Sequence, residues 1–174
     1  AFHALVAFGL LTGLAQAEGY PSKPVRVIIV SYPPDGFNDS LARCIRGRKL
    51  FPRFYELFLA SSQEVRDKFG TTDIRKHRRK LQKSIYVLVE YIAFGGPESK
   101  VYLEGLAEDH SKRGRDIPPH LYDLWLDCLL HAVKDCDELY SEQVAAAWRH
   151  MMGAGILLLK SRYDRPAESR EVAG

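Results

Sequence analysis

Residues 99–125 read Ser99-Lys-Val-Tyr-Leu-Glu-Gly-Leu-Ala-Glu-Asp-His-Ser-Lys-Arg-Gly-Arg-Asp-Ile-Pro-Pro-His-Leu-Tyr-Asp-Leu-Trp125, and this stretch decides the fold. Its first half has the spacing of a helix, because Leu103, Leu106 and Ala107 recur at intervals of three and four. His110 continues that apolar stripe, where another leucine would be expected. Two interpretations follow: a packed histidine with one ring nitrogen hydrogen-bonded, or a histidine that binds a metal.

Length and composition favour one globular domain. The chain has 174 residues, of which 46% are hydrophobic and 27% charged, enough for a buried core. Its formal net charge of +3 is too small to indicate a nucleic-acid or membrane partner. Cys44, Cys128 and Cys136 have no metal-binding spacing and cannot all pair within the chain. They favour reduced thiols in a reducing compartment.

The helical period continues on both sides of the opening stretch. Helices are predicted from a cap at residue 39 or 40 to about 49, at 53–60 after Pro52, at 63–69, from a cap at 72 or 73 to about 94, through His110, at 119–136, and after a cap at Ser141. No convincing strand occurs from residue 51 onward. The sequence therefore predicts an all-α domain of about seven helices at 37–165, followed by a polar tail at 166–174.

The first 36 residues have a different pattern. Residues 2–17 are apolar and end in Ala15-Gln16-Ala17, which is typical of a signal-peptidase site, with a loosely packed leader as the alternative. All of residues 25–30 except Arg26 are β-branched, and they predict one strand. Together with Tyr20-Pro-Ser-Lys-Pro24 and the turn Pro33-Pro-Asp-Gly36, this segment resembles the start of periplasmic solute receptors of tripartite tricarboxylate transporters. Such a receptor needs many further strands, so residues 1–36 are expected to be an appendage.

Several separated residues of the helical region share the spacing of a second family. They are Phe54-Tyr55-x-x-Phe58, Phe69, His77 with Leu81 one turn later, Leu106 with His110, Tyr122 and Trp125. This set resembles the bacterial single-domain globins and the haem domain of flavohaemoglobins over residues 37–163. The resemblance implies an all-α, globin-like fold of about seven helices around a haem pocket, with a non-globin N-terminal extension.

The resemblance implies haem b as the cofactor and His110 as the ligand of its iron. A hydrogen bond from the other ring nitrogen to a carbonyl near Leu106 would orient the imidazole. Tyr122 would support it as the family's neighbouring tyrosine, and Trp125 would line the pocket. In flavohaemoglobins a glutamate of the last helix joins this network. Tyr163 falls near that place, which argues against peroxidase-like or strong dioxygenase chemistry.

The opposite side of the pocket is implied to hold Tyr55, Phe69, His77 and Leu81. Tyr55 would donate a hydrogen bond to bound dioxygen, which acquires partial negative charge, and Phe69 would pack on the haem face. His77 and Leu81 would form the gate, and His77 could itself bind iron as a sixth ligand. The alternatives are that both aromatic residues belong to the ordinary core and that His77 belongs to the solvated basic run at residues 75–80.

Cations would be needed beside the haem propionates, and Arg78, Arg79 or Lys112 are the expected ones. The basic run at 75–80 also admits a nucleic-acid interpretation, but no aromatic residues interleave it. No nucleic-acid partner is therefore expected, and no membrane partner once any leader is removed.

The resemblance implies reversible binding of dioxygen, with nitric oxide and carbon monoxide as further ligands. Nitric oxide dioxygenation would be a side activity that needs an external reductase, because the chain has no flavin or nicotinamide motif, so the protein is not expected to be an enzyme. The alternatives are a fragment of the transporter receptor and a helical interaction domain without cofactor. A cytoplasmic location is expected for the globin domain, and a periplasmic one if the leader is genuine.

Overall fold

The computed structural model describes residues 33–164, and within that range the chain forms helices and no strand. The helices are α1 (Phe37–Arg46), α2 (Leu50–Ser61), α3 (Gln63–Phe69), α4 (Ile74–Phe94), α5 (Pro97–His110), α6 (Leu121–Cys136) and α7 (Glu142–Arg162). The prediction of an all-α fold with about seven helices is confirmed. The strand predicted at residues 25–30 and the leader before it lie outside the described residues.

Local signals place most helix ends where the sequence predicts them. The side chains of Ser62, Asp73 and Ser141 accept backbone N–H groups in the first turns of α3, α4 and α7. Gly95 ends α4 with φ +65°, a left-handed conformation that glycine adopts without steric cost, and Pro97 opens α5. The long α4 and α5 therefore end and begin at one short turn.

Four predicted boundaries are wrong. α1 begins at Phe37 and ends at Arg46, so Ser40 is not a cap but a buried residue inside the helix. α2 begins at Leu50, because Pro52 fits a first helical turn, where its missing N–H has no helical partner to lose. α6 begins at Leu121, two residues later than predicted.

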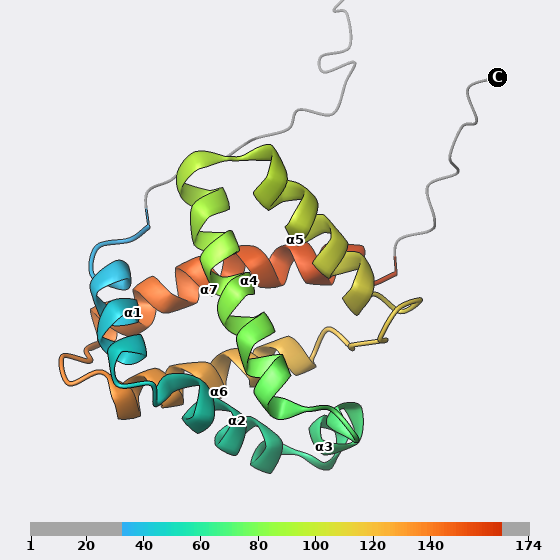
Figure 1. The fold of residues 1–174 in the computed structure, drawn as a ribbon, viewed down its shortest axis with the longest axis horizontal. Coiled ribbons are helices and arrows are strands. Elements are labelled where there is room, and N and C mark those ends of the chain that lie inside the picture. The colour runs from blue at the N-terminus through green and yellow to red at the C-terminus, as the bar shows by residue number, and fades with distance from the viewer. Residues whose placement is uncertain (1–32, 165–174) are drawn as a thin grey trace, which may run out of the picture.

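The helices cross one another in pairs around a common interior. α2 packs against α6, and α5 packs against both α4 and α7. In Figure 1, α4 and α5 form a hairpin, and α7 runs across α4. At that crossing a Cβ atom on Gly155 would lie 2.9 Å from Cδ2 of Leu88, so glycine permits the close approach. Among the helices described, none is both long and apolar enough to cross a membrane.

Trp148 anchors α1 to the core. Its indole is fully buried, and its ring centroid lies 4.8 Å from that of Phe37 in an edge-on arrangement. The indole Nε1 donates a hydrogen bond of 2.9 Å to Oγ of the buried Ser40. Nearby, Arg43 forms an ion pair with Asp137, which is only 3% exposed. Burial raises the pKa of Asp137, but hydrogen bonds from Arg43, Ser40 and a backbone N–H outweigh it and lower the pKa.

The change Ser40→Ala should destabilise the fold by about 1–3 kcal/mol, because it leaves the buried N–H of Trp148 without an acceptor. Urea unfolding followed by tryptophan fluorescence measures this loss. The matched control is Ser161→Ala, since Ser161 is exposed and bonds only a carbonyl of its own helix. Equal unfolding midpoints for the two variants would contradict the assignment.

Candidate functional site

A cavity of about 420 Å³ lies between α2, α3, α4, α5, α6 and α7. Its walls are largely apolar, and its volume falls in the range of cofactor and ligand pockets. The structure brings all eight residues singled out from the sequence to this one cavity: Tyr55, Phe69, His77, Leu81, Leu106, His110, Tyr122 and Trp125. They come from five helices and span some 70 positions of sequence, so their convergence is a property of the fold.

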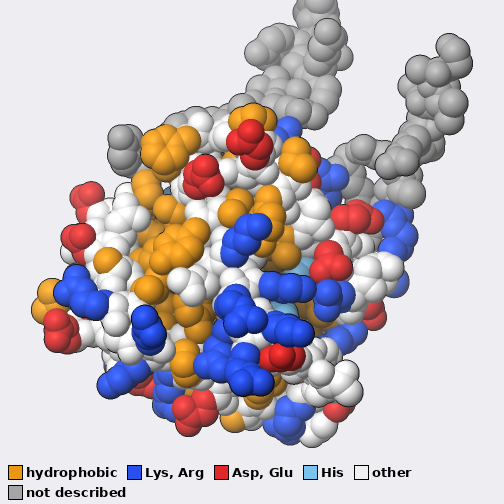
Figure 2. Space-filling model, viewed as in Figure 1, with side chains coloured by type: hydrophobic (Ala, Val, Ile, Leu, Met, Phe, Trp, Pro, Cys, Tyr) orange, Lys and Arg blue, Asp and Glu red, His pale blue; other side chains and the backbone are white. Residues whose placement is uncertain are grey.

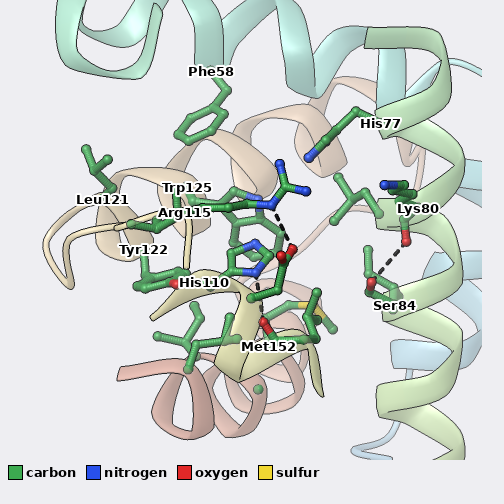
Figure 3. Close-up of a pocket in the computed structure, with 18 of the residues that line it drawn as sticks. Phe58, His77, Lys80, Ser84, His110, Arg115, Leu121, Tyr122, Trp125 and Met152 are labelled. Carbon is green, nitrogen blue, oxygen red and sulfur yellow. Dashed lines mark hydrogen bonds and ion pairs between the residues drawn. The ribbon is translucent and has the colours of Figure 1, made fainter. Parts of the chain in front are cut away.

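His110, the last residue of α5, presents one ring nitrogen to the cavity. Its Nδ1 donates a hydrogen bond of 2.9 Å to the carbonyl oxygen of Leu106, one turn back. Since a carbonyl only accepts, the proton of the neutral ring sits on Nδ1, and the lone pair is on Nε2. Burial lowers the pKa of His110, although the Leu106 bond and Asp109 raise it, so the neutral form is favoured. Figure 3 shows Nε2 turned away from the carbonyl, toward the side on which His77 lies.

Tyr122 and Trp125 of α6 flank the histidine. Figure 3 shows Tyr122 beside His110 on the same side of the cavity. Burial raises the pKa of Tyr122 to about 12, so its hydroxyl stays protonated at neutral pH. Trp125 packs edge-on against Phe54, with ring centroids 5.6 Å apart. The imidazole is thus held in an apolar, aromatic surrounding.

Tyr55 of α2 and His77 of α4 meet on the other side of the cavity. The hydroxyl oxygen of Tyr55 lies 2.5 Å from Nδ1 of His77, a hydrogen bond between helices. Burial raises the pKa of Tyr55 and lowers that of His77, so a neutral phenol faces a neutral imidazole. Depending on the tautomer, Tyr55 donates to Nδ1 and leaves a proton on Nε2, or Nδ1–H donates to Tyr55 and frees the phenol proton.

Phe69 completes an aromatic cluster around this pair. Its ring centroid lies 5.1 Å from that of His77, 5.9 Å from that of Tyr55 and 5.8 Å from that of Phe58. All three arrangements are edge-on, which suits the quadrupoles of the rings. The cluster packs apolar surface against the polar Tyr55–His77 pair.

Cations also line the cavity, but they are not the ones the sequence analysis expected. Lys68, Lys80 and Arg115 lie on its wall, whereas Arg78, Arg79 and Lys112 do not. Lys80 is one turn after His77 and shares its face of α4. The sequence signal for Lys80 was this spacing of three. Arg78 does not line the cavity, but it is half-buried and its charge opposes the rise in the pKa of Tyr55.

Arg115 reaches the cavity through a tight turn after α5. Backbone hydrogen bonds fold the turn back on the helix end, and a Cβ on Gly114 would lie 2.4 Å from the carbonyl oxygen of Asp109. Glycine is therefore required there, and the turn directs Arg115 over the cavity, where it bonds Asp109 at 2.7 Å. Figure 3 shows the guanidinium of Arg115 between His110 and His77.

Tyr163 does not join the surroundings of His110 by a hydrogen bond. Its hydroxyl instead donates to Oδ1 of Asp116 at 2.7 Å, and Asp116 also accepts from Lys68. These contacts tie the end of α7 to α3 and to the turn after α5. Tyr163 is thus bonded to Asp116 and not to His110 or Tyr122.

Comparison with known proteins agrees with this architecture. A model of the globin family matches residues 48–156. A solved structure from Pseudomonas aeruginosa PAO1, described as that of a protein structurally highly homologous to a human hemoglobin, is 43% identical to the chain. That match covers 73% of this chain and 95% of the other, with a TM-score of 0.68. A search among curated proteins finds no match.

Neither similarity supports the alternative of a transporter receptor fragment. The family match spans α2 to α6 and most of α7, and therefore includes every residue of the cavity named above. This chain belongs to the globin family.

Proposed function

We propose that this globin holds haem b through His110 and reversibly binds dioxygen, with nitric oxide and carbon monoxide as further ligands. The single observation that carries the proposal is the geometry of His110. Its Nδ1 is fixed by the Leu106 carbonyl, and its Nε2 lone pair faces an apolar cavity with a polar pair on the far side.

The residues of the cavity fit the chemistry of a haem. A haem is flat and mostly apolar, and it carries two carboxylates and one iron that accepts an imidazole nitrogen. The aromatic and aliphatic walls suit its ring, and Nε2 of His110 suits the iron. Lys68, Lys80 and Arg115 offer positive charge for the carboxylates. When bound, the haem supplies the ferrous iron at which a diatomic gas binds.

The protein's own residues orient the imidazole of His110, donate hydrogen bonds to a bound gas and exclude water. The Leu106 carbonyl fixes the tautomer of His110 and makes Nε2 a better donor of electron density. Tyr55 and His77 supply hydrogen-bond donors on the opposite side, where a bound gas with partial negative charge would lie. Phe58 and Phe69 shield that side from water, which strengthens such a bond.

Replacing the proposed iron ligand tests the cofactor. His110→Gly should abolish stoichiometric haem retention, because Nε2 is lost, and added imidazole should restore part of it by filling the space. The Soret absorbance of protein expressed with haem measures retention. The control is His131→Gly, an exposed histidine of α6.

Full haem retention with an unchanged spectrum in His110→Gly would contradict the assignment. A wild-type protein without a Soret band would instead favour the helical domain without cofactor.

Removing the phenol hydroxyl tests the opposite side. Tyr55→Phe should speed dioxygen dissociation by about tenfold, the equivalent of one hydrogen bond of about 1.4 kcal/mol. His77→Leu should also speed it, and the double variant should fall short of the sum of the two effects, because the residues act as one hydrogen-bonded pair. Stopped-flow replacement of dioxygen by carbon monoxide measures these rates.

The outcomes of this cycle separate the two tautomers. If Tyr55 carries the donor to the ligand, Tyr55→Phe has the larger effect, and if His77 Nε2–H carries it, His77→Leu does. If dioxygen dissociates from both variants at the wild-type rate, the Tyr55–His77 pair has a purely structural role.

A further inference from the structure

The first three turns of α4 carry a cluster of cations that are exposed except for the half-buried Arg78, and we call this cluster the α4 basic surface. It consists of Arg75, Lys76, Arg78, Arg79, Lys80 and Lys83. None of the six forms an ion pair with another described residue, although cations elsewhere, such as Lys160 and Arg53, do. Figure 2 shows blue side chains gathered over this half of α4, with histidine visible among them.

The positive charges of this surface repel one another. The pairs Arg75–Arg79, Lys76–Lys80 and Arg79–Lys83 stand four residues apart on one helix, a spacing at which like charges are destabilising. This destabilisation decreases when an acidic surface approaches and neutralises the positive charges. The cluster therefore favours a partner with negative charge.

The α4 basic surface borders the cavity. Lys80 belongs to both, and His77, which lies within the same run, contributes its ring to the cavity wall. A partner that covers this surface would sit at the edge of the haem pocket, on the side of the Tyr55–His77 pair. A surface next to the cofactor site suits a partner that exchanges electrons with the iron. A partner held only by electrostatic attraction would not need this location.

A shallow surface hollow continues from the cations along α4. It is lined by Arg79, Lys83, Tyr86 and Glu90, among others, and Tyr86 is 45% exposed. Arginine and tyrosine are enriched at the centres of protein interfaces. Side chains of a protein partner can pack into this hollow. A purely electrostatic contact with a phosphate backbone would not use it.

We propose that the α4 basic surface docks an acidic electron-transfer protein that reduces the haem iron. This inference rests on the proposed function, and it assigns a surface to the external reductase. One electron passes from the reduced donor to ferric iron, which becomes ferrous, the donor is oxidised by one electron, and no bond forms or breaks. Encounters of this kind are small and weak, and they depend on charge for their rate.

The test uses the full chain loaded with haem and a reduced plant-type [2Fe–2S] ferredoxin, an acidic one-electron donor, as the probe. Reduction of ferric protein under carbon monoxide is followed by stopped-flow absorbance over a range of ionic strengths. The test variant is Arg75→Gln/Lys76→Gln/Arg79→Gln, whose three residues do not line the cavity. The matched control is Arg46→Gln/Lys49→Gln/Arg149→Gln, three exposed cations on or next to other helices.

The wild-type rate should fall as salt rises, and the test variant should be roughly tenfold slower at low salt, with a flatter salt dependence. The control variant should stay within about twofold of wild type. Calorimetric titration with oxidised ferredoxin gives a readout without electron transfer, and binding should weaken in the test variant alone.

Equal rates and equal ferredoxin binding in the two variants overturn the proposal. It is also overturned if duplex DNA or phosphatidylserine vesicles bind at physiological salt and lose binding only in the test variant, while ferredoxin does not distinguish the variants. Failure of the proposed function is seen separately, as a wild-type protein without a Soret band. A normal Soret band with equal reduction rates in the two variants would overturn the docking surface and leave the proposed function standing.

Discussion

The hydrogen bond from Nδ1 of His110 to the carbonyl of Leu106 is the interaction on which the site depends. It links a ring at the very end of α5 to the rigid part of the same helix, so the direction of Nε2 is fixed by helix geometry. The turn that follows folds back on the helix end, where the N–H of Ile117 bonds the carbonyl of His110. These hydrogen bonds hold the end of α5 at His110, where a helix usually frays.

Burial keeps the titratable groups on both sides of the cavity neutral. On the His110 side, burial keeps the imidazole neutral and its Nε2 free to bind. On the far side, burial keeps both Tyr55 and His77 neutral and makes their hydrogen bond the favourable way to satisfy two polar groups in an apolar surrounding. The same low polarity would strengthen the contact of either group with a ligand.

The sequence predicted which residues meet at the cavity because helical period reveals the inward face of each helix. His110 was found in this way, and the resemblance to globins added Tyr55, Phe69, His77 and Leu81. The bond between Tyr55 and His77 could not be predicted, since it depends on how α2 and α4 cross. The cation Arg115 was missed because its position is set by a glycine-dependent turn, and turns have no period to follow.

The close crossing of α7 and α4 at Gly155 makes the size of the cavity sensitive to the residue at this position. A single missing methyl group lets α7 lie against Leu88, and both residues belong to the cavity wall. Replacing Gly155 by a larger residue would displace Leu88 or the helix, and would change the room at this wall without altering a donor or a charge. The size of the cavity at this wall can thus vary independently of the hydrogen-bonding and charged groups that line it.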